Sequence, residues 1–251
     1  MRLFTRLVKR WLGDSRGTTL AELMLAMTIG AFIIAAVFAV MVSLFHVTTT
    51  NSNYMAAFRQ VQDAGDWITR DALMAQQVSA MTSTALTLDI DEDDTVIPVD
   101  STIGFPDSGI VSIEDEIIRY TGIDNTDPDN PKFTGCIRGD NATAHEGGKL
   151  AGFLVAVDWV TWSGNHHQVF YNLKASNGRL ARSYLVNGTL TSYAVIAEAI
   201  DPSVTTSQWD YPSRELSVAI TANVGKYMPW KSGEWESTAT RTYKINPRPF
   251  Y

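Results

Sequence analysis

The stretch Arg16-Gly17-Thr18-Thr19-Leu20-Ala21-Glu22 leads directly into an apolar run, Leu23 to Phe45, that contains no charged residue. An α-helix rises about 1.5 Å per residue, so this run makes about 34 Å of helix, enough to cross a bilayer. Glu22 stands at the edge of the run, where a carboxylate is costly unless it lies at headgroup level or has a partner. We therefore predict a transmembrane segment over residues 23–45 with an acidic group at its head.

The segment before this run is basic. It carries Arg2, Arg6, Lys9, Arg10 and Arg16 against a single acidic residue. Positive charge of this kind keeps an N-terminus in the cytoplasm and sends the following domain outward. A cleaved secretory signal fits poorly, because the apolar run follows the candidate cut instead of preceding it. A cut after Gly17 would create a new α-amino group on Thr18, four residues before Glu22.

The string Gly-Thr-Thr-Leu-Ala-Glu-Leu-Met-Leu-Ala-Met over residues 17–27 resembles the class III signal of type IV prepilins and type II secretion pseudopilins. This resemblance implies cleavage between Gly17 and Thr18 by a prepilin peptidase, followed by N-methylation of Thr18. It also implies that Glu22 assists assembly by neutralising the terminal amine of a neighbouring subunit. Thr18 departs from the Phe or Met usual at its position. An ordinary signal anchor is the alternative.

The charge and cysteine content limit the classes of function. The chain has 251 residues and a formal charge of −7, and loss of residues 1–17 would leave about −11. Such an acidic domain argues against nucleic-acid binding, which depends on clustered Lys and Arg. Cys136 is the single cysteine, so no internal disulfide can form and burial of apolar side chains must stabilise the fold.

The hydrophobic pattern predicts an α+β fold in three parts after the leader peptide 1–17. Residues 18–80 are predicted as one long helix, transmembrane in its first half and amphipathic in its second. Residues 84–148 contain short alternating runs between Gly/Pro turns, which predicts an inserted small β module. Residues 149–251 read as antiparallel strands that cover the apolar stripe of the helix.

Two further resemblances concern these parts. The sequence Val169-Phe170-Tyr171-Asn172-Leu173, with Gly178–Arg182, is similar to the sheet of J-type minor pseudopilins and minor pilins. Together with the N-terminal signal this implies a type IV pilin-like fold. The runs 100–106, 116–122 and 133–139 resemble a small β module of phage tail and surface proteins. Ala39 stands where major pilins often have a proline that loosens the helix.

Candidate sites of chemistry are few. Asp124, Asp127 and Asp129 lie in an acidic turn that could hold Ca²⁺, but the run lacks the glycine and distal glutamate of an EF-hand loop. Solvated turns are the favoured interpretation, and we expect no cofactor. The histidines have no zinc spacing, and a catalytic pair of Cys136 with His145 lacks a visible orienting group. We expect a protein that is not an enzyme.

These observations predict a minor pilin or pseudopilin that assembles into a type IV pilus or secretion pseudopilus. Its expected partners are prepilin peptidase, other pilins or pseudopilins and an inner-membrane assembly platform. We expect a single-pass inner-membrane protein, N-terminus inside, that passes into an extracytoplasmic filament or to the cell surface. The alternatives are an adhesin-like surface protein whose 84–148 module binds a ligand, and a membrane-anchored enzyme. The sequence does not separate pilus, secretion and DNA-uptake systems.

Overall fold

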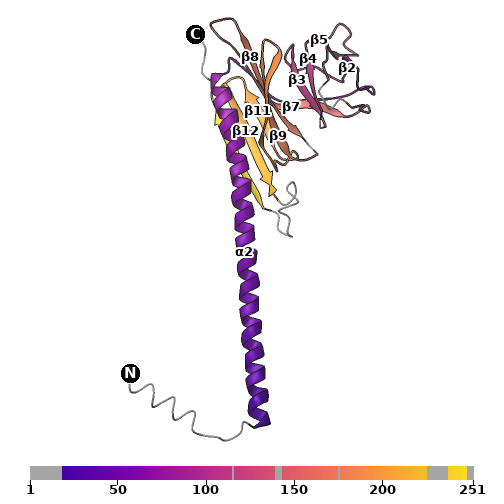
Figure 1. Ribbon diagram of the computed structural model, residues 1–251. Helices are drawn as coiled ribbons and strands as arrows, with labels where there is room; N and C mark the ends of the chain where they lie inside the picture. The colour runs from indigo at the N-terminus through magenta and orange to yellow at the C-terminus, as the bar shows by residue number, and fades with distance from the viewer. Residues whose placement is uncertain (1–18, 115, 139–142, 175, 225–236, 248–251) are drawn as a thin grey trace. The chain divides into compact units, whose positions relative to one another are not determined.

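The computed structural model describes residues 19–114, 116–138, 143–174, 176–224 and 237–247. Its chain divides into two compact units, Met1–Thr49 and Thr50–Tyr251. One long helix, α2 (Leu20–Met74), runs through both (Figure 1). No proline interrupts this segment, and Ala, Leu and Met are strong helix formers. The fold class is α+β, as predicted.

The helix ends at Met74, earlier than the predicted residue 80. Gln77–Ala85 forms strand β1, antiparallel to β7 (Leu150–Val160). The change begins at Gln76, whose backbone N–H donates to Asp158 O at 2.8 Å. The Gln76 side chain also donates to Val160 O (3.2 Å) and accepts from Val160 N–H (3.1 Å). Tertiary pairing with β7 therefore overrides the local helical pattern of residues 75–80.

The largest sheet of the second unit is antiparallel and seven-stranded. Its order is β10-β9-β8-β7-β3-β4, with β1 also paired to β7. The strands not yet given are β3 (Gly109–Ile113), β4 (Glu116–Tyr120), β8 (His166–Lys174), β9 (Arg179–Val186) and β10 (Thr189–Ala197).

Two three-stranded sheets complete the described strands. The first consists of β11 (Thr206–Asp210), β12 (Glu215–Asn223) and β13 (Thr238–Ile245). The second consists of β2 (Val96–Pro98), β6 (Lys132–Thr134) and β5 (Gly122–Asp124).

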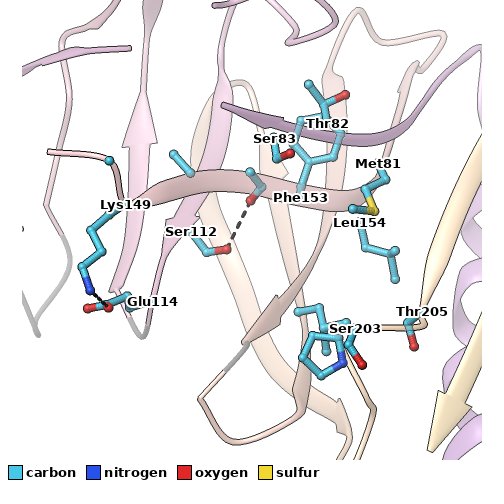
Figure 2. Close-up of a pocket in the computed structure, with 15 residues that line it drawn as sticks. Met81, Thr82, Ser83, Ser112, Glu114, Lys149, Phe153, Leu154, Ser203 and Thr205 are labelled. Atoms are coloured by element: carbon cyan, nitrogen blue, oxygen red, sulfur yellow. Dashed lines mark hydrogen bonds and ion pairs between the residues drawn. The ribbon is translucent and has the colours of Figure 1, made fainter. Parts of the chain in front are cut away.

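Strand β7 is where the sheet forks. On one edge it pairs with β1, and on the other it pairs with two different strands. Residues Val155–Val160 pair with β8, whereas Ala151 and Gly152 pair with β3. In the β1–β7 pairing, Met81 and Leu154 are not paired with each other. The side chain of Ser207 in β11 bridges the two residues instead. Met81 N–H donates to Ser207 Oγ at 2.6 Å, and the Ser207 hydroxyl donates to Leu154 O. Met81 and Leu154 both line a cavity of about 580 Å³ beside this ladder (Figure 2).

The two faces of the forked sheet carry two separate cores. On one face, Val169 and Tyr171 pack with the buried helix residues Val61 and Ile68 and with the β11–β13 sheet. On the other face, Phe170 and its neighbours pack with side chains of residues 86–136, among them Phe105, Tyr120 and Phe133. Residues 84–148 therefore pack around a second core that they share with Phe153, Phe170 and Leu185 of the sheet, and their strands β3 and β4 belong to that sheet.

Candidate functional site

The head of α2 carries a hydrogen-bonded pair, Thr19 and Glu22. Glu22 N–H donates to Thr19 Oγ1 at 3.3 Å, and Thr19 N–H donates back to Glu22 Oε2 at 3.0 Å. The Thr19 hydroxyl also donates to Oε2 at 3.3 Å. This reciprocal arrangement is a capping box, which satisfies N–H groups that the first helical turn leaves without partners. The carboxylate uses only Oε2 for the cap.

The residues after Glu22 form an apolar surface. Among the described residues, α2 is the one helix long and apolar enough to cross a membrane, and its most apolar stretch is 0% buried. Leu23, Phe32, Phe38 and Phe45 are all more than half exposed. Exposed apolar surface of this extent is typical of a site of membrane or protein interaction. The helix is therefore compatible with a membrane anchor or a signal sequence.

The predicted processing site lies outside the described residues. Gly17, Thr18 and the basic leader 1–17 precede Thr19, where the described chain begins. Cleavage at Gly17–Thr18, methylation of Thr18 and its pairing with Glu22 remain predictions. The structure adds that Glu22 already has a role within its own chain as the cap of α2. The Thr-x-x-Glu motif of residues 19–22 is the sequence signature of this role, and it is not among the predictions made above from the sequence.

In the acidic turn considered for Ca²⁺, Asp124 and Asp127 already bind groups of their own chain. Asp124 Oδ1 accepts hydrogen bonds from Thr126 Oγ1 (2.6 Å) and Thr126 N–H (3.0 Å), and Asp124 Oδ2 lies 3.3 Å from Lys132 Nζ. These bonds lower the pKa of Asp124 to about 2, Thr126 having the larger effect. Asp127 Oδ1 caps Asp129 N–H at 3.1 Å. Within the described ranges, no three His, Cys, Asp or Glu side chains gather as a metal-binding group.

Cys136 and His145 do not form a pair. Cys136 is buried in the core of residues 86–136, and burial raises the pKa of its thiol to about 11, which disfavours the reactive thiolate. His145 Nε2 instead lies 2.9 Å from Glu116 Oε2, and its Nδ1 lies 3.7 Å from Glu114. Glu116 also accepts from Arg138 Nε at 2.6 Å and Arg138 Nη2 at 2.7 Å. This arrangement holds the module together.

A second buried ion pair joins the helix to the sheet. Asp71 is 1% exposed and accepts hydrogen bonds from the Tyr171 hydroxyl, Arg182 Nε (2.6 Å) and Arg182 Nη2 (3.1 Å). Burial and the adjacent Asp71 carboxylate raise the pKa of Tyr171. The partners are separated by about a hundred residues, so spacing could not reveal them. The available signal was an aspartate directly beside the apolar stripe of Ile68 and Ala72.

Comparison of the chain with protein-family models, curated protein sequences and solved structures finds no match.

Proposed function

We propose that this protein is a structural subunit of a membrane-assembled filament, of the type IV pilin or type II pseudopilin kind. The observation that carries the proposal is a capped Glu22 directly followed by an uncharged, exposed apolar helix surface. A membrane would cover that surface before assembly. In a filament, neighbouring helices would cover it instead.

The proposed assembly step uses the carboxylate that caps the helix. Cleavage after Gly17 would leave the Thr18 amine as the charged group next to the apolar run. Glu22 Oε1 takes no part in the capping box, so it is the oxygen that would accept the Thr18 amine of a neighbouring subunit. In a low-dielectric helix bundle, a carboxylate and an ammonium group stabilise each other strongly. Helix register would then follow from this pairing.

The small residues of the apolar run support close helix packing. Ala26, Gly30, Ala31, Ala35 and Ala39 recur along it, and a Cβ added at Gly30 would meet no atom within 4 Å. Small side chains let helix backbones approach in an apolar environment. We propose an inner-membrane protein with its second unit outside, processed by a prepilin peptidase and incorporated by an assembly platform.

The deciding experiment measures the N-terminus and assembly separately. The full chain is produced in a bacterial host with a prepilin peptidase, and its intact mass and N-terminal sequence are determined. We expect a mature start at Thr18 with one added methyl group. A protein that retains Met1, or that is cut beyond Phe45, would contradict the proposal.

Two substitutions separate the cap from the charge. Glu22→Gln keeps a residue that can close a capping box but removes the negative charge, whereas Glu22→Ala removes both. If charge pairing directs assembly, both processed variants should be absent from sheared filaments. Entry of Glu22→Gln at the wild-type level would assign Glu22 to the cap alone.

A second candidate function is display of a ligand-binding surface by residues 84–148. The observation that favours it is that their core lies on the sheet face opposite the helix stripe. Exposed module side chains can therefore vary without disturbing helix packing. Deletion of the module would expose Phe153 and Phe170, so surface variants are the better test. Leu88→Asp with Ile103→Asp should abolish surface adhesion with filaments intact if display is the function.

A further inference from the structure

Helix α2 contains a segment of low helix propensity, residues 47–52, with the sequence Val-Thr-Thr-Thr-Asn-Ser. β-Branched residues lose side-chain freedom in a helix, and Asn and Ser form competing hydrogen bonds with the backbone. All six residues therefore rank below Ala, Leu and Met as helix formers. The segment carries no charge, so it forms none of the i,i+4 ion pairs that support exposed helices. Its local sequence gives this part of the helix little stability.

Tertiary packing adds little to this segment. Five of its six residues are exposed. The sixth, Thr50, is half-buried, and its carbonyl oxygen accepts a hydrogen bond from Ser237 Oγ at 3.3 Å. The first buried residue of α2 is Asn53. The second unit therefore holds the helix from Thr50 onward, which agrees with the division of the chain directly before that residue.

A membrane would hold the helix on the other side of the segment. In hydrocarbon no water competes for backbone groups, so each N–H and C=O must bond within the helix. The apolar run makes about 34 Å of helix and so already exceeds the hydrocarbon core of about 30 Å. Residues 47–52 then lie in the aqueous interface, where water can replace any helical hydrogen bond that opens. The segment is thus a weak part between two parts that are held as helix.

A side-chain hydrogen bond weakens the helix further at the start of the segment. Thr48 Oγ1 donates to Leu44 O at 2.8 Å, the carbonyl oxygen that the Thr48 N–H also uses in an α-helix. Bonds of this kind slightly destabilise helices and often bend them. Thr28 makes a similar bond to Leu25 O at 2.8 Å, but within the apolar run. At Thr48 the bond coincides with a water-exposed segment of low propensity.

We propose that α2 opens reversibly at residues 47–52 and acts as a hinge between its apolar half and the half that packs in the second unit. Hinges of this kind are a few residues that absorb the change in backbone angles between two rigid parts. The hinge would let the second unit change its orientation while the helix stays in the bilayer. It depends on the membrane role of the apolar run, but on neither cleavage after Gly17 nor Glu22. A chain produced without prepilin peptidase therefore tests the hinge separately from filament assembly.

Distances between paired spin labels measure the hinge directly in the full chain in lipid nanodiscs. One pair, Val37→Cys with Met55→Cys, spans the segment, and the control pair, Met55→Cys with Leu73→Cys, lies beyond it. All three positions are exposed, and each pair is 18 residues or about 27 Å apart on an ideal helix. Cys136 is buried, so the introduced cysteines take the label. We expect a distance distribution at least about twice as wide for the spanning pair, and equal widths would overturn the proposal.

Alanine substitutions test whether low helix propensity causes the hinge. Thr48→Ala, Thr49→Ala and Thr50→Ala are combined in one chain, because alanine is the best helix former. The distance distribution of the spanning pair should narrow to the width of the control pair. Amide hydrogen exchange in peptides that cover residues 47–56 should slow at least about 10-fold relative to the wild type. Failure of either measurement to change would overturn the proposal.

A matched control makes the same kind of change in α2 outside the segment. It combines three substitutions of hydroxyl residues, Thr28→Ala, Ser43→Ala and Thr69→Ala. This variant should keep the wild-type width of the spanning pair and the wild-type exchange of residues 47–56. Thermal unfolding confirms that the second unit folds in both triple variants. Equal narrowing in the control would show that the motion is not located at residues 47–52 and would overturn the proposal.

Discussion

At the residue scale, the buried carboxylate of Asp71 connects the helix to the sheet. This carboxylate accepts hydrogen bonds from the Tyr171 hydroxyl in β8 and from the Arg182 guanidinium group in β9. Replacement of Asp71 by Ala would leave the partly buried guanidinium group of Arg182, whose side chain is 16% exposed, without its counter-ion. Loss of one partner of a buried pair costs about 3–5 kcal/mol. We expect Asp71→Ala to lower the free energy of unfolding by that amount, measured by urea denaturation of the full chain in detergent.

The matched control lies five residues earlier on the same helix. Asp66 is exposed, so Asp66→Ala should change the free energy of unfolding by about 0.5 kcal/mol or less. Equal effects of the two variants would contradict the assignment of Asp71 as the connecting residue.

At the element scale, Gly65 determines how closely α2 approaches the β11–β13 sheet. A Cβ added at Gly65 would lie 1.9 Å from the Tyr243 ring, whose hydroxyl donates to Val61 O at 3.0 Å. An alanine usually stabilises a helix by about 1 kcal/mol relative to glycine. Gly65→Ala must instead displace the ring, and we expect a loss of about 1–3 kcal/mol in the free energy of unfolding.

A double-mutant cycle checks the cause of this loss. In a Tyr243→Ala background the ring is absent, so Gly65→Ala should become stabilising. Gly30→Ala serves as a control on the same helix, since its added Cβ meets nothing within 4 Å. A loss of the same size with and without Tyr243 would show that the ring is not responsible.

The elements also show what the sequence could predict. The apolar helix and the antiparallel strands of residues 149–251 follow from hydrophobic periodicity, and the structure places β7, β8, β9, β12 and β13 within that range. Strand β1 was assigned to the helix, because its sequence Gln-Val-Ser-Ala-Met-Thr-Ser-Thr-Ala has no clear alternation and pairing with β7 decides its structure. Strand β10 is an exposed edge, so it lacks the buried alternation that reveals other strands. The capping box was readable in residues 19–22, whereas the partners of Asp71 and Glu116 depend on tertiary contacts.

At the scale of the whole molecule, one sheet supports two cores, so we expect them to unfold together. Val169 and Tyr171 of β8 belong to one core and Phe170 to the other. A charge cluster in the module should therefore affect the stability of the entire second unit. Glu116 is the centre of that cluster. Burial opposes its ionisation, but hydrogen bonds from Arg138 and His145 outweigh burial and lower its pKa from the ordinary value of 4.5.

The sign of the pH effect follows from this lowered pKa. The folded state binds the Glu116 proton less readily than the unfolded state, so the stabilisation is complete well above pH 4.5 and is lost as the pH falls below it. Glu116→Gln should cost about 3 kcal/mol or more at pH 7, because it leaves Arg138 without a buried counter-ion. The difference between wild type and variant should shrink as the pH falls from 5 to 3.

Glu114 provides the control, because it contacts the same histidine from an exposed position. Its side chain is 51% exposed and lies 3.7 Å from His145, so Glu114→Gln should cost about 1 kcal/mol or less at any pH. Tryptophan fluorescence and far-UV circular dichroism should give coincident urea transitions for all variants if the shared sheet couples the two cores. Separate transitions in Glu116→Gln would instead show that the module opens while the helix and its sheet remain folded. A pH-independent difference would contradict the role given to Glu116 ionisation.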